Sequence, residues 1–335
     1  MTEANKKRLT YVDIGKGLGM MMIVWMLVWG NNAYGFTPPH WLNSNISKIY
    51  VPLFFVLSGY LIRINALDYK TAVRKKVLSI LRPFGVMYVL SFAASFLLSL
   101  LGVGTKHIFE WANFFNPFFS KTFFNGPLWF LLALFWSFLL FYSLVSCART
   151  KLLPLILASL ALGCIGFYLD KWGITLPLFF GQGLVGCPML LTGLLIKKYL
   201  GRIFMEQKLH TLGLGIMGTL VFALFGSGLS MQDNTYSGMY PLFLLGVAGG
   251  SVMFLSVSVL LEKCLPFAIY WGRYSLVVLC LHNFILIPAS RVAARFVHQP
   301  LAWAAVTFII VYLAFMAVIQ LAAKFTPSLF NIKKK

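Results

Sequence analysis

The residue best placed to do chemistry is Lys16, a cation inside the apolar stretch 13–32. About 20 apolar residues at 1.5 Å each cross the roughly 30 Å hydrocarbon core of a bilayer, so this stretch can span a membrane. A charge at membrane depth marks a functional site, or else a side chain that reaches the surface from a helix end. Leu27 lies eleven residues later, on the same helix face and about 16 Å deeper.

A second group of basic residues follows the expected second span. Lys70, Arg74, Lys75, Lys76 and Arg82 make this the most basic part of the chain. Basic residues beside a span can rest on anionic lipid head groups. Alternatively, they form a cytoplasmic site for an anionic cofactor, because a guanidinium group binds phosphate through paired hydrogen bonds.

Polar residues also recur in the stretch 273–289. Tyr274 and Ser275 precede His282 and Asn283 by about two helical turns, which places these polar groups on one face. A lone histidine in an apolar helix is more often structural than catalytic. Both interpretations of His282 stay open at this point.

Membrane helices must position these residues. The chain is 60% hydrophobic and only 11% charged, whereas soluble domains are about a quarter charged. Hydropathy predicts an all-α, polytopic membrane protein with about ten transmembrane helices, as a single domain over 1–335. The predicted spans are 13–33, 49–66, 77–102, 128–146, 152–169, 174–198, 211–229, 240–262, 273–289 and 301–324. The five cysteines have no disulfide or zinc spacing, so we expect no metal site.

The basic residues predict the orientation of these spans. With a cytoplasmic N-terminus, 21 of the 28 Lys and Arg residues fall in inside segments and six in outside loops, and Lys16 is the remaining one. Cytoplasmic loops carry an excess of Lys and Arg, so we expect both termini in the cytoplasm. The formal charge of +20 then reflects membrane orientation, and we expect no nucleic acid partner.

Four motifs follow one another along the chain. They are R-x4-D-x2-K-G from Arg8 to Gly17, PLFFVLSGYLI in the second span, GPLWFLLALF in the fourth and YSLVVLCLH in the ninth. In this order, and with ten spans, they resemble the acyltransferase-3 family of integral membrane acyltransferases over the whole chain. The resemblance implies a multi-pass protein of the bacterial cytoplasmic (inner) membrane. It also implies transfer of an acyl group, usually acetyl, from cytoplasmic acyl-coenzyme A to a sugar hydroxyl of an envelope glycan or glycolipid.

The resemblance also assigns site residues for the coenzyme and for the acceptor. The coenzyme residues are Lys16, Arg74, Lys75 and Arg82, and the acceptor residues are Ser58 and Trp129. Asn31 is added to the acceptor residues because it lies four residues after position 27, on nearly the same helix face. The expected partners are membrane lipids, acyl-coenzyme A (acetyl-coenzyme A) and a sugar or glycan acceptor. A homodimer is an open alternative to a monomer.

The chain departs from the family pattern at position 27. The family has a catalytic histidine ten residues beyond its basic residue, and this sequence has Leu27 there. Removing a proton from a hydroxyl needs a base, which leucine cannot supply. We therefore expect an inactive or impaired enzyme, with His282 and His40 as surrogate bases to test. The alternative is a non-catalytic relative or a transporter that binds a glycolipid or acyl-coenzyme A.

Overall fold

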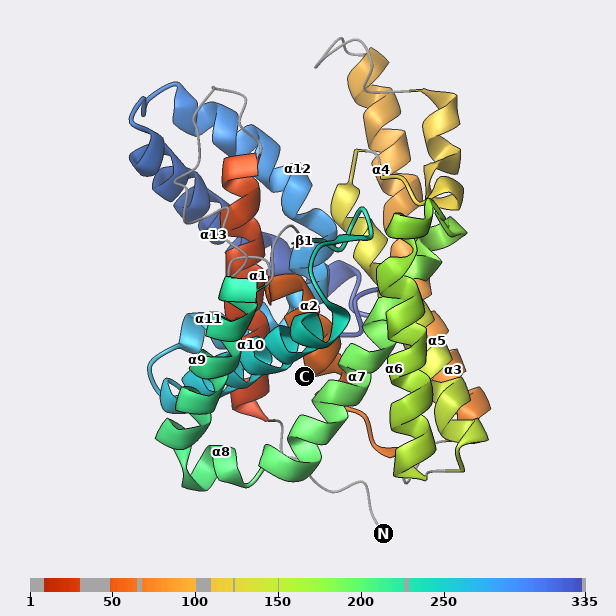
Figure 1. Cartoon of the computed structure of the whole chain (residues 1–335). Helices are drawn as coiled ribbons and strands as arrows, with labels where there is room; N and C mark the ends of the chain where they lie inside the picture. The colour runs from red at the N-terminus through yellow and green to blue at the C-terminus, as the bar shows by residue number, and fades with distance from the viewer. Residues whose placement is uncertain are drawn as a thin grey trace.

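The computed structural model describes residues 9–30, 49–64, 68–100, 110–122, 124–149, 151–225 and 229–332. Within these ranges the chain is helical apart from short connections and one small hairpin (Figure 1). This confirms the all-α prediction. Asn31 and His40 lie outside the described residues.

The elements are named here in chain order. The α-helices are α1 (Thr10–Gly30), α2 (Tyr50–Tyr60), α3 (Tyr69–Lys76), α4 (Arg82–Leu100), α5 (Trp129–Cys147), α6 (Leu152–Tyr168), α7 (Phe180–Leu200), α8 (Ile203–Glu206), α9 (Lys208–Phe225), α10 (Tyr240–Leu260), α11 (Pro266–Arg273), α12 (Ser275–Ala294) and α13 (Pro300–Phe325). The π-helical turn η4 (Val77–Leu81) joins α3 to α4. Short 3₁₀ turns are η5 (Trp111–Phe119), η6 (Gly126–Leu128), η7 (Asp170–Trp172) and η8 (Pro177–Phe179). The antiparallel strands β1 (Leu229–Ser230) and β2 (Thr235–Tyr236) form the hairpin.

Each of the ten predicted spans contains a helix. Seven helical segments of the described chain are long and apolar enough to cross a membrane: Thr10–Trp29, Tyr69–Leu100, Gly126–Cys147, Pro177–Leu200, Tyr240–Leu260, Ser275–Ala294 and Pro300–Phe325. The helices α2 and α6 are apolar but shorter. Helices are what an apolar chain adopts in lipid, because each satisfies its own backbone hydrogen bonds. The count of ten spans and the cytoplasmic termini stay predictions.

The helices form two groups joined by α2 and α7. In Figure 1, α1 and α9 to α13 lie on one side, and α3 to α6 lie on the other. The joining helices pack against each other, α2 also against α1, and α7 also against α5 and α6. A hydrogen bond of 2.8 Å between the hydroxyls of Tyr11 and Tyr60 links the start of α1 to the end of α2.

Among the described helices that pack backbone against backbone are one pair that includes α1 and one that includes α2. A Cβ atom on Gly17 of α1 would lie 1.9 Å from the carbonyl oxygen of Ala268 in α11. A Cβ atom on Gly59 of α2 would lie 1.9 Å from the carbonyl oxygen of Leu190 in α7. Only glycine permits such an approach, as is common where membrane helices associate. The two glycines therefore fix the positions of α1 and α2.

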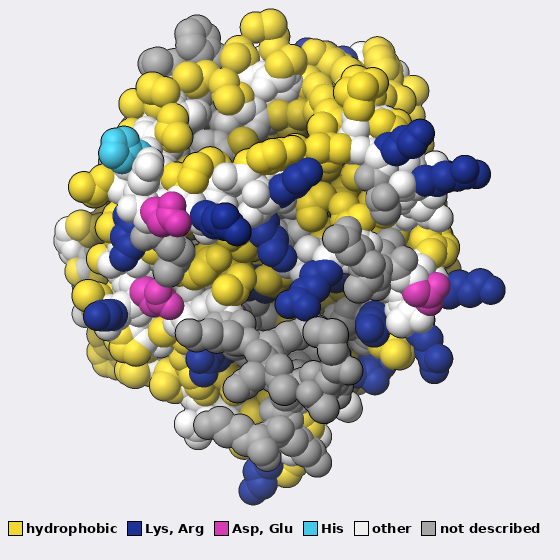
Figure 2. All heavy atoms as spheres, turned by 90° about the horizontal axis from the view of Figure 1, so that it is seen from below, with side chains coloured by type: hydrophobic (Ala, Val, Ile, Leu, Met, Phe, Trp, Pro, Cys, Tyr) yellow, Lys and Arg dark blue, Asp and Glu magenta, His cyan; other side chains and the backbone are white. Residues whose placement is uncertain are grey.

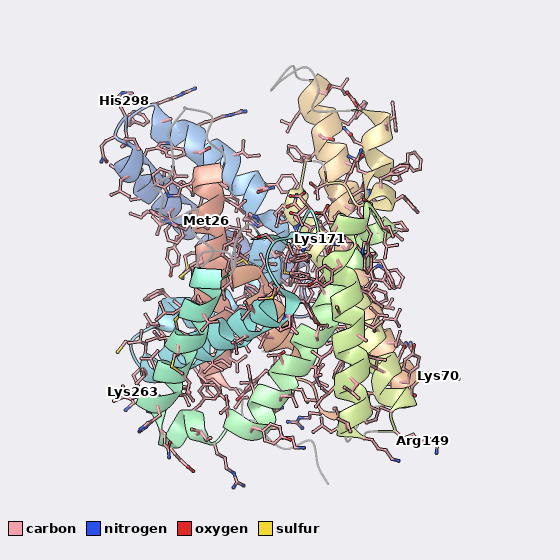
Figure 3. The ribbon with its side chains drawn as sticks, in the orientation of Figure 1. Met26, Lys70, Arg149, Lys171, Lys263 and His298 are labelled. Atoms are coloured by element: carbon pink, nitrogen blue, oxygen red, sulfur yellow. The ribbon has the colours of Figure 1, made fainter. Side chains whose placement is uncertain are left out.

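The basic residues gather at the end of the molecule where α1 begins. Seen from that end, Lys and Arg side chains are spread over the surface and Asp and Glu are few (Figure 2). Figure 3 places Lys70, Arg149 and Lys263 at this end and His298 at the opposite one. The first three come from predicted inside segments and His298 from a predicted outside loop. Which side of the membrane this end faces stays a prediction.

Candidate functional site

A cavity of about 580 Å³ lies between the two groups of helices. Its wall comes from α1, α2, the junction of α3 with η4, η6 with α5, the hairpin, and α12. Segments far apart in the sequence thus meet around one space. A cavity of this size, mostly apolar with a few polar groups, is the usual form of a small-molecule site.

Helix α1 runs along the length of the cavity. Lys16, Met20, Ile23 and Leu27 line the cavity in turn, and the helical rise separates the first from the last by about 16 Å. The predicted face of α1 therefore runs along the cavity. Lys16 is at the end where α1 begins, which is the end with the basic surface.

Two lysines stand at this end of the cavity, which we call the lysine end. Lys76, the last residue of α3, lines the cavity with Lys16, and its Nζ lies 3.4 Å from the centroid of the Phe138 ring. No carboxylate, imidazole or thiol is among the described residues that line the cavity. Asp13, one turn before Lys16, lies outside the wall, and its Oδ2 is 3.6 Å from Nε of Arg273. The described lining of the cavity thus has two amino groups at its lysine end and no carboxylate.

Lys76 was not among the coenzyme residues inferred from the resemblance, and three that were lie elsewhere. Arg74 and Lys75 are exposed and do not line the cavity. Arg82 donates a hydrogen bond from Nη2 to the carbonyl oxygen of Ser328. The spacing of Lys76 from Ser79 and Ile80 could have identified it. These two residues lie three and four positions later and also line the cavity, and residues so spaced share a helix face.

The start of α3 is capped by Asp68. The backbone N–H of Thr71 donates a 3.0 Å hydrogen bond to Oδ2 of Asp68. Hydrogen bonds from the side chain and the backbone of Thr71 hold the pKa of Asp68 below its ordinary value. The cap satisfies a free N–H at the start of the short helix that carries Lys76 into the wall.

The C-terminal segment 326–332 holds the junction of α3 and α4. In addition to the contact of Arg82 with Ser328, Nδ2 of Asn331 donates a 3.1 Å hydrogen bond to the carbonyl oxygen of Ser79. Phe330 of the same segment is buried. The segment that follows α13 therefore supports the part of the wall that contains Ser79.

The hairpin forms another part of the cavity wall, which we call the hairpin end. Its Ser230, Met231 and Gln232 line the cavity. Nε2 of Gln182 in α7 donates a 2.8 Å hydrogen bond to the carbonyl oxygen of Gln232. Nε2 of Gln232 donates a 3.2 Å hydrogen bond to Oγ1 of Thr122. The hairpin tip is thus braced from two sides, a feature that the sequence analysis missed.

Two of the inferred acceptor residues, Ser58 and Trp129, line the cavity together with Leu27. His282 does not line it. This histidine is fully buried, its Nδ1 is 2.9 Å from the carbonyl oxygen of Val278, and Nε2 has no hydrogen-bond partner among the described residues. The next residue, Asn283, lines the cavity instead. The polar pair of α12 is therefore divided between the core and the cavity.

The arrangement suits a long ligand with an anionic end. The cations lie at the lysine end, apolar side chains form most of the wall, and amides reach the space from Gln232 and Asn283. Such a space can hold phosphates at one end and a hydroxyl-bearing molecule at the other. The described wall offers no imidazole or carboxylate to take a proton from that hydroxyl.

The chain matches a known protein family. The family model Acyl_transf_3, described as an acyltransferase domain, matches residues 9–319. A search of curated proteins found no match. The matched range contains every residue described above as lining the cavity, and it covers most of the chain. The chain therefore belongs to the acyltransferase-3 family of membrane acyltransferases.

Proposed function

We propose that this acyltransferase moves an acyl group from cytoplasmic acyl-coenzyme A to a sugar hydroxyl of an envelope glycan or glycolipid. The observation that carries the proposal is a cavity lined by two lysines at one end and by amides toward the other. Its lysine end lies toward the end of the molecule with the basic surface, which the orientation prediction places in the cytoplasm. The membrane is then the bacterial cytoplasmic membrane, and the expected acyl group is acetyl.

The lysine end suits the donor. Lys16 and Lys76 contact the coenzyme phosphates through their amino groups, as lysines do in phosphate sites. The distance of about 16 Å from Lys16 to Leu27 accommodates the extended pantetheine arm. The thioester then lies beside Leu27.

Leu27 makes the transfer step slow. A hydroxyl that attacks a thioester must lose its proton, and a positioned base typically accelerates such a step by about 10²–10⁴-fold. Leu27 supplies no base, and His282 lies in the core away from the wall. We infer that the present sequence binds its substrates but transfers the acyl group poorly.

The second candidate function is a non-catalytic relative or a transporter that binds a glycolipid or acyl-coenzyme A. The lack of a carboxylate or imidazole in the described wall favours it. The two candidates differ in what a base at position 27 achieves. An enzyme gains turnover, whereas a binding protein does not.

The test is to replace Leu27 with His. Membranes that contain the native glycan acceptor are supplied with acetyl-coenzyme A, and release of free coenzyme A is measured. We expect Leu27→His to raise the rate by about 10²–10⁴-fold. The matched control is Leu27→Gln, which adds a polar side chain without a base and should not raise the rate. If Leu27→His binds coenzyme A but stays as slow as the control, the enzyme assignment fails in favour of the second candidate.

A further inference from the structure

Two side-chain amides line the cavity away from its lysine end, Gln232 in the hairpin and Asn283 in α12. The side chain of Asn283 has no hydrogen-bond partner among the described residues. In Gln232, Nε2 is bonded to Oγ1 of Thr122 at 3.2 Å, and the described chain offers no partner to Oε1. Both amides therefore keep polar atoms with which to bind a ligand.

The course of α12 separates Asn283 from the lysines. Oδ2 of Asp13 lies 3.6 Å from Nε of Arg273, so the chain just before α12 lies beside the first turn of α1. From Ser275, α12 runs away from the basic end of the molecule (Figure 1). Asn283 is eight residues along α12, about 12 Å beyond its start. Lys16 is only three residues, or about 4.5 Å, beyond Asp13. The two side chains thus meet different parts of a ligand.

The hairpin holds Gln232 in a defined position. Besides the bond to Thr122, its backbone carbonyl oxygen accepts a 2.8 Å hydrogen bond from Nε2 of Gln182. Ser230, which also lines the cavity, donates a 2.6 Å hydrogen bond from Oγ to Oδ2 of Asp233. The carboxylate of Asp233 is exposed and lies outside the wall. The hairpin therefore offers an amide and a hydroxyl to the cavity, with a negative charge nearby.

This lining has a chemical preference. A sugar hydroxyl both donates and accepts hydrogen bonds, and so does a side-chain amide, whereas a carboxylate only accepts them. Burying a charge without a partner is far more costly than burying a hydrogen-bonded neutral group. Among the described lining residues, the basic side chains are Lys16 and Lys76, both at the lysine end. An anionic group beside the two amides would find no cation in this wall.

We propose that Asn283 and Gln232 select a neutral sugar as the acceptor and discriminate against sugars that carry a carboxylate. The inference rests on the proposed function for its sugar acceptor. It adds the class of sugar and the two residues that recognise it. Both act by binding sugar hydroxyls, and neither takes the proton or the acyl group.

Matched pairs of methyl glycosides test the proposal. Methyl glucoside and methyl glucuronide differ only in a hydroxymethyl group or a carboxylate on C5, and so do methyl galactoside and methyl galacturonide. Each is titrated by saturation-transfer NMR into the full chain in lipid nanodiscs, with empty nanodiscs as the blank. Saturating coenzyme A is present, so that its phosphates occupy the lysine end. We expect the neutral sugar of each pair that binds to bind at least about tenfold more tightly than its acidic partner. Acidic sugars that bind as tightly as the neutral ones, or more tightly, overturn the proposal.

Alanine variants locate the effect. Asn283→Ala and Gln232→Ala should each weaken binding of the neutral sugar by about fivefold, the usual worth of one hydrogen bond, while coenzyme A binds as before. The matched control is Gln207→Ala, which removes an exposed amide outside the cavity wall and should change neither affinity. Sugar binding that is the same in Asn283→Ala as in Gln207→Ala contradicts the role of Asn283.

Coenzyme A binding separates this proposal from the proposed function. If coenzyme A does not bind to the unchanged protein, the donor assignment fails, and with it the proposed function. If coenzyme A binds but neither neutral sugar does, the two amides do not form a sugar site. The present proposal is then wrong, although the donor assignment stands.

Discussion

Helix α1 and the continuous helix from α3 to α4 both carry a lysine into the cavity, but they are held in different ways. In the most apolar stretch of α1, 56% of the residues are buried, against 28% in that of Tyr69–Leu100. Backbone contact with α11 fixes α1 at Gly17. The α3 to α4 helix is supported at its junction by the C-terminal segment 326–332.

The difference shows that the two cavity lysines are held in place by packing of unequal strength. The contact at Gly17 has no room for any side chain, so its loss displaces the whole helix. The contacts of Ser79 and Arg82 are single hydrogen bonds on an exposed helix, and each contributes little. Lys16 should therefore be sensitive to packing changes, and Lys76 should tolerate them.

The largest effect is expected from Gly17→Val. A Cβ atom there lies 1.9 Å from the carbonyl oxygen of Ala268, whereas one on Gly85 of α4 meets no atom within 4 Å. We expect Gly17→Val to destabilise the fold by more than about 3 kcal/mol, beyond ordinary overpacking, and Gly85→Val to be nearly neutral. Thermal unfolding in detergent measures both. Similar melting temperatures for the two variants contradict the comparison.

A smaller effect is expected from removing the cavity lysines. Lys16→Ala and Lys76→Ala should each weaken coenzyme A binding by about tenfold or more, since each removes a charge that faces the phosphates. Lys75→Ala changes the exposed neighbour of Lys76 and should weaken binding less than about twofold. Calorimetry on the purified protein measures the three affinities. Binding that depends on Lys75 but not Lys76 places the phosphates outside the cavity.

The smallest effect is expected at the C-terminal segment. Asn331→Ala removes the hydrogen bond to Ser79 and should cost about 1 kcal/mol, seen as a lower midpoint of thermal unfolding. Ser328→Ala is the control, because Arg82 contacts the backbone carbonyl oxygen of Ser328 and the substitution leaves that atom in place. A larger loss in Ser328→Ala than in Asn331→Ala means that the segment is held by other contacts.

The sequence predicted where the helices lie better than it predicted which basic side chains line the cavity. Apolar length predicts a membrane helix because backbone satisfaction leaves the chain few alternatives. The face shared by Lys16 and Leu27 follows from the helical repeat alone. Which residues of a basic cluster face inward depends on the neighbouring helix, and only the structure shows that Lys76 meets Phe138 while Arg74 and Lys75 stay exposed.

The same reason explains α12 and the hairpin. The motif drew attention to His282, but the rotation of α12 places Asn283 in the wall, and neighbouring residues on a helix point about 100° apart. The hairpin has two residues in each strand, too short for a strand pattern. Its place in the wall comes from partners far away in sequence, Thr122 and Gln182, which local periodicity does not reveal.

The contacts of the C-terminal segment have a consequence for measuring membrane orientation. Reporter proteins for topology are commonly fused at the C-terminal side of the last span, and a fusion directly after Ile332 adjoins the segment that contacts Arg82 and Ser79. A bulky reporter at this place disturbs the contact with Ser79, which lines the cavity. Lost coenzyme binding in such a fusion then reflects the attachment and says nothing about the side of the membrane. Single cysteines in the loops between helices, tested with an impermeant thiol reagent, measure orientation and leave the contacts of the C-terminal segment unchanged.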